Sequence, residues 1–178
     1  MIACSLLHLD AASFCAMLQV VLLGISLIFI YSQLRVYRQA NMLQIIGGFD
    51  ARWVSTTFSN QRARVCSKYD ASAAKLSREE IAVLGFFEDL AVYLKRGIID
   101  TSLVWDKYSY SIEYYWALFQ PRIMKFRSDQ NDKTFYDQFE YMNGMMASHA
   151  SSQALKYGKK DNEELEAFRR HESELLPS

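Results

Sequence analysis

Glu88 is the acidic residue best placed for a chemical role. In the helical pattern of residues 77–97 it lies at the margin of the apolar face. A carboxylate there needs a partner, because removing a charge from water is costly. The bases that we expect to form an ion pair with it are Arg62, Arg64 or Arg122. A catalytic acid would require a second acid or a histidine at motif spacing, which the sequence around Glu88 does not offer.

The remaining candidates for chemistry are weaker. His8, His149 and His171 lie in separate segments, and none has a second histidine or cysteine at zinc-site spacing. The acidic run at 129–132 lacks the mid-loop glycine and closing glutamate of an EF-hand. P-loop, G-x-S-x-G and Rossmann glycine patterns are missing from the sequence. We therefore predict a non-enzymatic protein with no catalytic residue, metal site or cofactor; an enzyme that uses Glu88 is the second alternative.

The segment that dominates the sequence is an uncharged run of 22 residues at 11–32. About 20 apolar residues in a helix cross a hydrocarbon core roughly 30 Å thick. We predict a single transmembrane helix at 11–33. A cleaved signal peptide is the alternative; it would need a basic residue before the run and a small-x-small cleavage site after it, and neither is present.

The charges that flank this run predict its orientation. Arg35 and Arg38 follow it, whereas residues 1–10 contain no Lys or Arg. Because Lys and Arg near a span stay on the cytoplasmic side, we expect the N-terminus outside the bacterial inner membrane and the rest of the chain in the cytoplasm. Cys4 is then the one cysteine that would meet an oxidising compartment.

Small and polar residues recur on one face of the predicted span. The stripe consists of Ala12, Cys15, Gln19, Ser26 and Gln33. Gln19 is near the midplane, where an unpaired amide is costly. Such stripes associate membrane helices at about 0.6–2 kcal/mol per polar contact. The stripe allows a homodimer, and the alternative is a single tolerated Gln.

Charge is balanced overall, with 20 basic and 20 acidic residues, but it is unevenly distributed. Residues 35–68 carry six bases against Asp50, and residues 161–178 carry six acids against two arginines. Anionic lipid attracts a basic segment beside a span by about 1 kcal/mol per Lys or Arg. We therefore assign the bases to the lipid bilayer and to topology, and regard nucleic acid as a poor candidate partner.

The segment after the span reads as all-α, a bundle of about five helices. Prolines are restricted to Pro121 and Pro177, and no alternating strand pattern persists. Ser77 and Glu80 have capping-box spacing, and Gly97 stands where a helix would end. The apolar face between them consists of Val83, Phe86, Phe87, Leu90, Ala91 and Leu94.

Further helices follow on both sides of this one. Asp100 would cap a short helix, and a second helix would bury Ile112, Tyr115, Trp116, Phe119, Ile123 and Phe126, with Pro121 opposite. Asp132 would cap the next helix, in which Phe135, Phe139, Met142 and Met146 share a face. Upstream, we expect a break at 47–48, because two glycines cost about 1 kcal/mol each in a helix, and then a helix at 50–68.

These patterns give five regions. They are a short extracytoplasmic leader at 1–10, the transmembrane helix at 11–33, juxtamembrane basic helices and a linker at 34–76, a helical core at 77–150, and a polar, partly disordered or weakly helical tail at 151–178.

Aromatic segments of the core carry a family resemblance. FFEDL at 86–90 is followed by LKRGIID at 94–100, and the pattern continues with Trp105, Tyr115-Trp116, Pro121, Arg127 and FYDQFEY at 135–141. Together these segments resemble the bacterial family catalogued as domain of unknown function 4760, over about residues 34–146. The resemblance implies a short protein with an N-terminal span and a helical cytoplasmic domain, and it implies no known reaction.

The sequence thus favours a single-pass membrane protein whose cytoplasmic domain is a non-catalytic scaffold for interaction or sensing, with an unknown protein partner. The first alternative is a membrane-active effector that oligomerises through its transmembrane helix.

Overall fold

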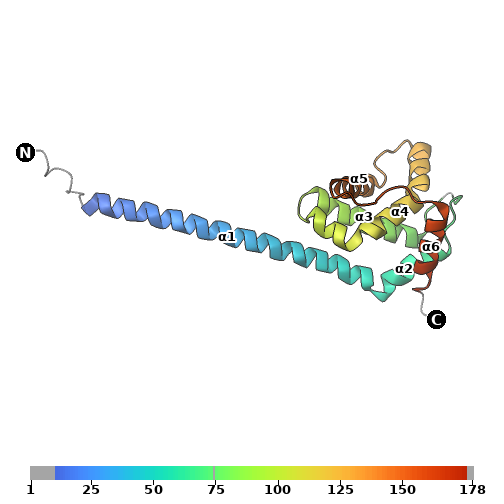
Figure 1. Ribbon diagram of the computed structural model, residues 1–178, viewed down its shortest axis with the longest axis horizontal. Helices are drawn as coiled ribbons and strands as arrows, with labels where there is room; N and C mark the ends of the chain where they lie inside the picture. The colour runs from blue at the N-terminus through green and yellow to red at the C-terminus, as the bar shows by residue number, and fades with distance from the viewer. Residues whose placement is uncertain (1–10, 74, 176–178) are drawn as a thin grey trace, which may run out of the picture. The chain divides into compact units, whose positions relative to one another are not determined.

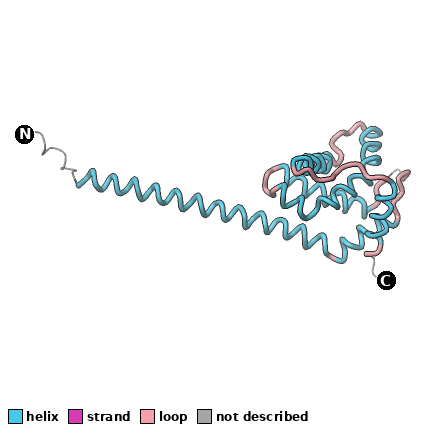
Figure 2. The backbone as a smooth tube through the Cα atoms, viewed as in Figure 1, coloured by secondary structure: helices cyan, strands magenta, loops and turns pink. Residues whose placement is uncertain are grey.

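A computed structural model describes residues 11–73 and 75–175, and in these ranges the chain forms helices and loops without strands (Figures 1 and 2). The helices are α1 (Ala11–Val54), α2 (Thr56–Ser67), α3 (Arg78–Lys95), α4 (Thr101–Gln130), α5 (Asp137–Ser152) and α6 (Asn162–Ser173). The prediction of an all-α chain, with one apolar N-terminal helix and about five further helices, is confirmed. The predicted leader at 1–10, with Cys4 and His8, lies outside the described residues.

The chain divides into two compact units, Met1–Gln44 and Ile45–Ser178. In the first unit, the described side chains of residues 13–41 are all exposed. Within Ser13–Val54 lies an 18-residue window with mean hydropathy 2.4 and no buried residue. By length and composition, this is one helix capable of crossing a membrane among the residues that the structure describes.

The second unit is a helical bundle around an aromatic core. Its fully buried large side chains include Phe86 and Phe87 from α3, Tyr115 and Phe119 from α4, and Phe139 from α5. Phe87 and Phe139 stack with ring centroids 4.7 Å apart. The last turns of α1 belong to this unit, and Trp53 lies within 6.4 Å of five aromatic rings.

The predicted helix break at 47–48 is wrong, because α1 continues through both glycines to Val54. Ile46 is buried, and Phe49 packs edge-to-face on Phe86 at 5.5 Å. Burial of large apolar side chains stabilises by about 1.5–3 kcal/mol each, which offsets the cost of two glycines. The chain instead turns at Ser55, whose hydroxyl accepts a hydrogen bond from the Phe58 amide at 3.3 Å and begins α2.

The start and end of α3 are as predicted. Ser77 and Glu80 form a capping box. Gly97 has φ 64°, the left-handed conformation that glycine adopts without steric cost. The whole predicted apolar face, from Val83 to Leu94, is buried.

Two helices predicted in the next segment are one. Asp100 caps α4 by accepting the Ser102 amide at 2.8 Å, as expected, but the helix then runs for 30 residues. Val104 and Tyr108 are buried and extend the predicted stripe toward the N-terminus, so no gap remains between the helices. Pro121 is exposed, on the side away from the buried Ile123.

The described part of the C-terminal segment contains a helix, α6 (Asn162–Ser173). Asp161 and Glu164 form a second capping box that begins α6. Phe168 is buried and meets the Tyr115 ring edge-to-face at 5.1 Å. Glu172 is buried one turn later. A charged helix with few apolar residues is therefore fixed through a single aromatic anchor and one buried carboxylate.

Candidate functional site

The principal polar site of the bundle is a buried ion pair between α2 and α6. Arg62 Nη1 lies 3.1 Å from Glu172 Oε2, and both side chains are less than a tenth exposed. The Tyr115 hydroxyl of α4 donates to the same carboxylate oxygen at 2.9 Å. The Arg62 guanidinium lies over the Trp53 ring, 4.0 Å from its centroid. This network, Trp53–Arg62–Tyr115–Glu172, therefore joins α1, α2, α4 and α6.

A free thiol, Cys66, is buried beside this network. Cys66 Sγ lies 3.9 Å from the Tyr115 hydroxyl. Burial, with the negative charge of Glu172, raises the pKa of the Cys66 thiol to about 12. Burial is also the main reason that the pKa of Tyr115 lies well above its ordinary value. A raised pKa leaves little thiolate at neutral pH, and the thiolate is the nucleophilic form, so the position of Cys66 favours a packing role.

A second buried pair joins Arg122 of α4 to Glu80 of α3. Arg122 Nη2 also donates to the Lys75 carbonyl at 2.8 Å. The other oxygen of Glu80 accepts the Ser77 amide at 2.7 Å, so one carboxylate caps its own helix and neutralises a buried base. The two functions explain how Glu80 is buried at modest cost.

A third buried pair lies at the end of the α5–α6 connection. Lys160 Nζ is 2.9 Å from Glu113 Oε1, and both side chains are less than a tenth exposed. The same oxygen accepts the Gly158 amide at 2.5 Å. The pair thus attaches the segment before α6 to the middle of α4.

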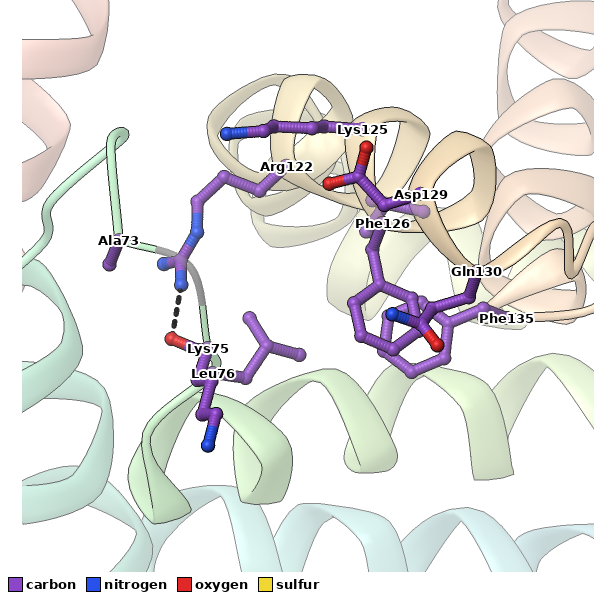
Figure 3. A pocket seen from close by; sticks show the side chains of 10 residues that line it. Ala73, Lys75, Leu76, Arg122, Lys125, Phe126, Asp129, Gln130 and Phe135 are labelled. Atoms are coloured by element: carbon purple, nitrogen blue, oxygen red, sulfur yellow. Dashed lines mark hydrogen bonds between the residues drawn. The ribbon is translucent and has the colours of Figure 1, made fainter.

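The cavity shown in Figure 3 is lined by Ala73, Lys75 and Leu76 on one side and by residues of α4 on the other, and it has a volume of about 210 Å³. The Phe126 and Phe135 rings stack on one side with centroids 4.1 Å apart. On the other side Arg122 points to the Lys75 carbonyl. Ligand pockets are usually about 300–1,000 Å³, so this cavity fits a single side chain or small apolar group rather than a cofactor.

The predicted ion pair of Glu88 is wrong. Its carboxylate accepts the Phe139 amide at 2.9 Å and the Gln138 amide at 3.3 Å, in the first turn of α5. The three predicted partners, Arg62, Arg64 and Arg122, instead pair with Glu172, Glu79 and Glu80. Helix N-termini carry unpaired amides and partial positive charge, and the N-cap Tyr136 supplies no side-chain bond. Glu88 therefore caps α5 from α3; burial raises its pKa, and the two amide hydrogen bonds oppose that rise.

Comparison with protein families found a match over residues 13–145 to the model described as a domain of unknown function, number 4760. The matched segment is 133 of the 178 residues. The chain belongs to this family. Comparisons with curated proteins and with solved structures found no match.

The extent of the match to domain of unknown function 4760 adds two points. It begins in the apolar part of α1, about 20 residues before residue 34, where the inferred resemblance starts. It ends within α5, so α6, which supplies Phe168 and Glu172, follows the matched region. In this member of the family, the Arg62–Glu172 pair joins a matched helix to an unmatched one.

The predicted stripe on α1 is exposed wherever its side chains are described. Cys15, Gln19, Ser26 and Gln33 all face outward, while the side chain of Ala12 lies outside the described residues. Ser26 Oγ donates to the Leu22 carbonyl of its own helix at 2.8 Å. Arg35 and Arg38 are also exposed. Their contacts with lipid, and the homodimer, stay predictions.

The remaining candidates take structural positions. His149 is half-buried, with its ring 5.2 Å from that of Trp105, as a histidine at the core edge would be. The run at 129–132 ends α4, where Asp132 accepts the Thr134 amide in a turn rather than capping α5. Over residues 11–73 and 75–175, no three His, Cys, Asp or Glu side chains gather in a way that would hold a metal.

Sequence reasoning missed most of the buried charges. Glu80 was predicted as a capping residue, but its second role with Arg122 spans 42 positions and has no local signal. Glu113 lies beside the apolar stripe of α4, next to Ile112. Glu172 lies four residues after Phe168, on the same face of α6. That spacing is the one signal from which its burial was predictable.

Proposed function

We propose that this protein is a single-pass membrane protein whose helical bundle acts as a non-catalytic scaffold that binds another protein on the cytoplasmic side. One observation carries the proposal. α1 is unbroken from Ala11 to Val54; its first part exposes apolar side chains, and Trp53, near its end, packs among the aromatic rings of the bundle.

The dimensions of α1 support the anchoring part. The 22 uncharged residues span about 33 Å as a helix, close to the thickness of a hydrocarbon core. Arg35 and Arg38 follow immediately and are exposed, as the positive-inside rule requires for a cytoplasmic C-terminal side. Because the helix continues past these residues, the span and the first turns of the bundle are one secondary-structure element.

The state of the buried acids supports the scaffold part. Glu80, Glu113 and Glu172 each meet a buried base, and both oxygens of Glu88 accept backbone amides. Catalytic acids need a proton-transfer partner in a cleft. These carboxylates are already occupied in holding helices together.

The aromatic side chains restrict where a partner would bind. Trp53, Trp105 and Tyr114 are half-buried, and Trp116 is buried. Among the described residues of the bundle, the tyrosines that stay exposed are Tyr93, Tyr110 and Tyr141, on three different helices. A partner of the bundle would therefore meet dispersed tyrosines and polar side chains, in the manner of a non-obligate interface.

Topology is tested with the full chain in cells. A cysteine at exposed position 162, in a variant whose natural cysteines are replaced, should react with an impermeant maleimide in inside-out vesicles and not in intact spheroplasts. An N-terminal epitope should stay joined to the bundle on a denaturing gel. Labelling in spheroplasts would reverse the orientation, and a soluble bundle that has lost the epitope would show cleavage.

The scaffold is tested by purification from native membranes under mild detergent. One partner should co-purify in constant ratio with the wild-type chain and with Gln19→Leu, which alters α1 alone. Glu172→Gln, which loosens the bundle, should lose it. Loss of the partner with Gln19→Leu, and retention with Glu172→Gln, would place binding on α1 and contradict the proposal.

A second function is favoured by Gln19, which makes no side-chain hydrogen bond among the described residues and lies in the apolar part of α1. A membrane-active effector would use such amides to oligomerise and permeabilise the bilayer. Overexpression would then depolarise cells and arrest growth, and Gln19→Leu would remove the effect. Normal growth and potential at high expression would exclude this function.

A further inference from the structure

A heptad pattern runs along α1 beyond the predicted span. Six residues seven positions apart are small or polar: Ala12, Gln19, Ser26, Gln33, Ala40 and Gly47. The residues three positions after the first five of these are Cys15, Leu22, Phe29, Val36 and Leu43. We call these eleven residues the α1 seam, with the first set at heptad positions a and the second at d. Four of the apolar d residues, Leu22, Phe29, Val36 and Leu43, are 55–65% exposed.

Charge is excluded from the seam and its margins. Between residues 11 and 47 the charged residues are Arg35 and Arg38. With Gln33 at a, these occupy positions c and f, the positions farthest from the a and d residues on a helical wheel. Positions e and g carry no charge over the same range. Both arginines therefore leave this face free to meet another uncharged helix.

At Gly47, its last residue, the seam is not covered by the bundle. Ile46 is buried, whereas the next residue, Gly47 of the seam, is exposed. The bundle therefore covers another side of the helix at this level. Gln19, at the same heptad position nearer the membrane centre, has an amide without a hydrogen-bond partner among the described residues. In hydrocarbon such an amide is costly unless another chain supplies the partner.

We propose that two copies of this chain pair in parallel along the α1 seam, from the span into the segment that follows it. The inference rests on the proposed function, because two copies with one topology must lie parallel in the same membrane. Each seam residue then faces its own counterpart, so Gln19 meets Gln19 and Gln33 meets Gln33 in register. Such amide pairs fix register and oligomeric state in helical dimers.

The length of the seam favours pairing with a second copy along the whole helix over a single contact at Gln19 within the membrane. From residue 12 to residue 47 it extends about 54 Å along the helix. It covers five heptads, with a small or polar residue at each a position and an apolar residue at four of the five d positions. Val36 and Leu43 lie after Arg35, beyond the uncharged run, where exposed apolar side chains face water and gain from burial by about 25 cal/mol per Å².

Disulfide crosslinking of full chains in native membrane vesicles tests the proposal. In a background with Cys4→Ser, Cys15→Ala and Cys66→Ala, single cysteines are placed at Val36 and Leu43 of the seam. The matched controls are Arg38→Cys and Asn41→Cys, two positions away and off the seam. Under mild oxidation, the seam variants should give several-fold more covalent dimer than their controls. Adding Gln19→Leu should lower the yield at Val36→Cys, and Gln19→Asn should preserve it.

Equal crosslinking at all four positions would indicate random collision and overturn the proposal. So would crosslinking of the seam cysteines to a different chain, or an unchanged yield with Gln19→Leu. Absence of dimer at every position, with maleimide labelling at position 162 still normal, would reject the pairing while the proposed topology stands. Failure of that labelling would instead reject the proposed function.

Discussion

The two units of the chain place apolar and charged side chains in opposite ways. In residues 13–32, α1 exposes phenylalanine, leucine and isoleucine and carries no charge. The bundle buries five charged residues: Arg62, Glu80, Glu113, Arg122 and Glu172. The apolar side chains of this helix are exposed in the described residues. The buried charges, in contrast, find their partners within the bundle.

We therefore expect α1 to determine where the chain is located and the buried ion pairs of the bundle to affect its stability. Arg62 and Glu172 are 110 residues apart, so their pairing requires that α6 returns to α2. Ion pairs of this kind contribute little net stability compared with apolar residues of the same size, but breaking them is costly. We therefore expect the bundle to be sensitive to the loss of a single charge, and α1 to the gain of one.

The largest effect is expected from Glu172→Gln, which leaves Arg62 buried and uncompensated. The free energy of unfolding of the full chain in detergent should fall by about 3–5 kcal/mol, as measured by chemical denaturation. The control is Glu166→Gln in the same helix, since Glu166 is 67% exposed in its pair with Arg169. That variant should change stability by at most about 1 kcal/mol. If both variants lowered the free energy of unfolding equally, burial of the Arg62–Glu172 pair would not explain the effect.

A double variant sharpens the first prediction. Replacing the pair together, as Arg62→Met with Glu172→Leu, removes both charges and retains apolar volume. It should recover most of the stability lost in Glu172→Gln, because no charge is left unpaired. A double variant as unstable as the single one would show that Tyr115 and Trp53 depend on the charges for their positions.

The complementary prediction introduces a charge into α1. Val20 is 68% exposed, lies near the centre of the uncharged run, and is off the seam. Val20→Arg should cost about 3 kcal/mol on insertion into a bilayer, so a larger share of the chain should be extracted from membranes by alkaline carbonate. Ile81→Arg is the matched control in the bundle, because Ile81 is also exposed, at 52%. If both variants stayed in the membrane equally, α1 would not be the anchor.

Next in size is the cap that α3 provides for α5. Glu88→Ala should lower the free energy of unfolding by about 1–2 kcal/mol, the range for loss of an N-cap, because the amides of Gln138 and Phe139 lose their acceptor. Asp89→Ala, in which an exposed pair with Arg52 is lost, should have a smaller effect. Amide hydrogen exchange should rise in the first turn of α5 in the Glu88 variant alone. Faster exchange throughout the bundle would point to a wider role.

These contrasts also show what the sequence predicts and what it does not. Local patterns were enough to predict the uncharged span, the Ser77–Glu80 capping box, the end of α3 at Gly97 and the apolar faces. Each of these features depends on residues within one or two helical turns. The break at 47–48 was predicted from local propensity and was overridden by the packing of Ile46 and Phe49. Local patterns thus fail where tertiary contacts decide.

The candidate site was less predictable for the same reason. Glu88 was correctly placed at the edge of the core, but its partner is a helix terminus 50 residues away that residue types do not reveal. Arg62 and Arg122 were available to several acids on sequence grounds. Only the fold determines that Arg62 pairs with Glu172 and Arg122 with Glu80.

The smallest effect concerns Asp50, near the end of α1, and it depends on pH. Burial raises the pKa of this carboxyl, but hydrogen bonds from Lys107 and Tyr108, with the Lys107 charge, outweigh burial and hold the pKa below its ordinary value. A carboxylate whose pKa is lower in the folded chain stabilises the fold above its unfolded pKa, and this contribution is lost as the pH falls through the folded pKa. Asp50→Asn should therefore cost up to about 1 kcal/mol at pH 7, because the pair is partly exposed, and the difference from wild type should shrink below about pH 4.

Other acids with lowered pKa values, such as Asp100 and Asp132, are common to both chains and cancel in this difference. Denaturation of the two chains from pH 7 to pH 3 measures it, and a difference that stayed constant would show that Asp50 acts through packing against Tyr108 rather than through its charge.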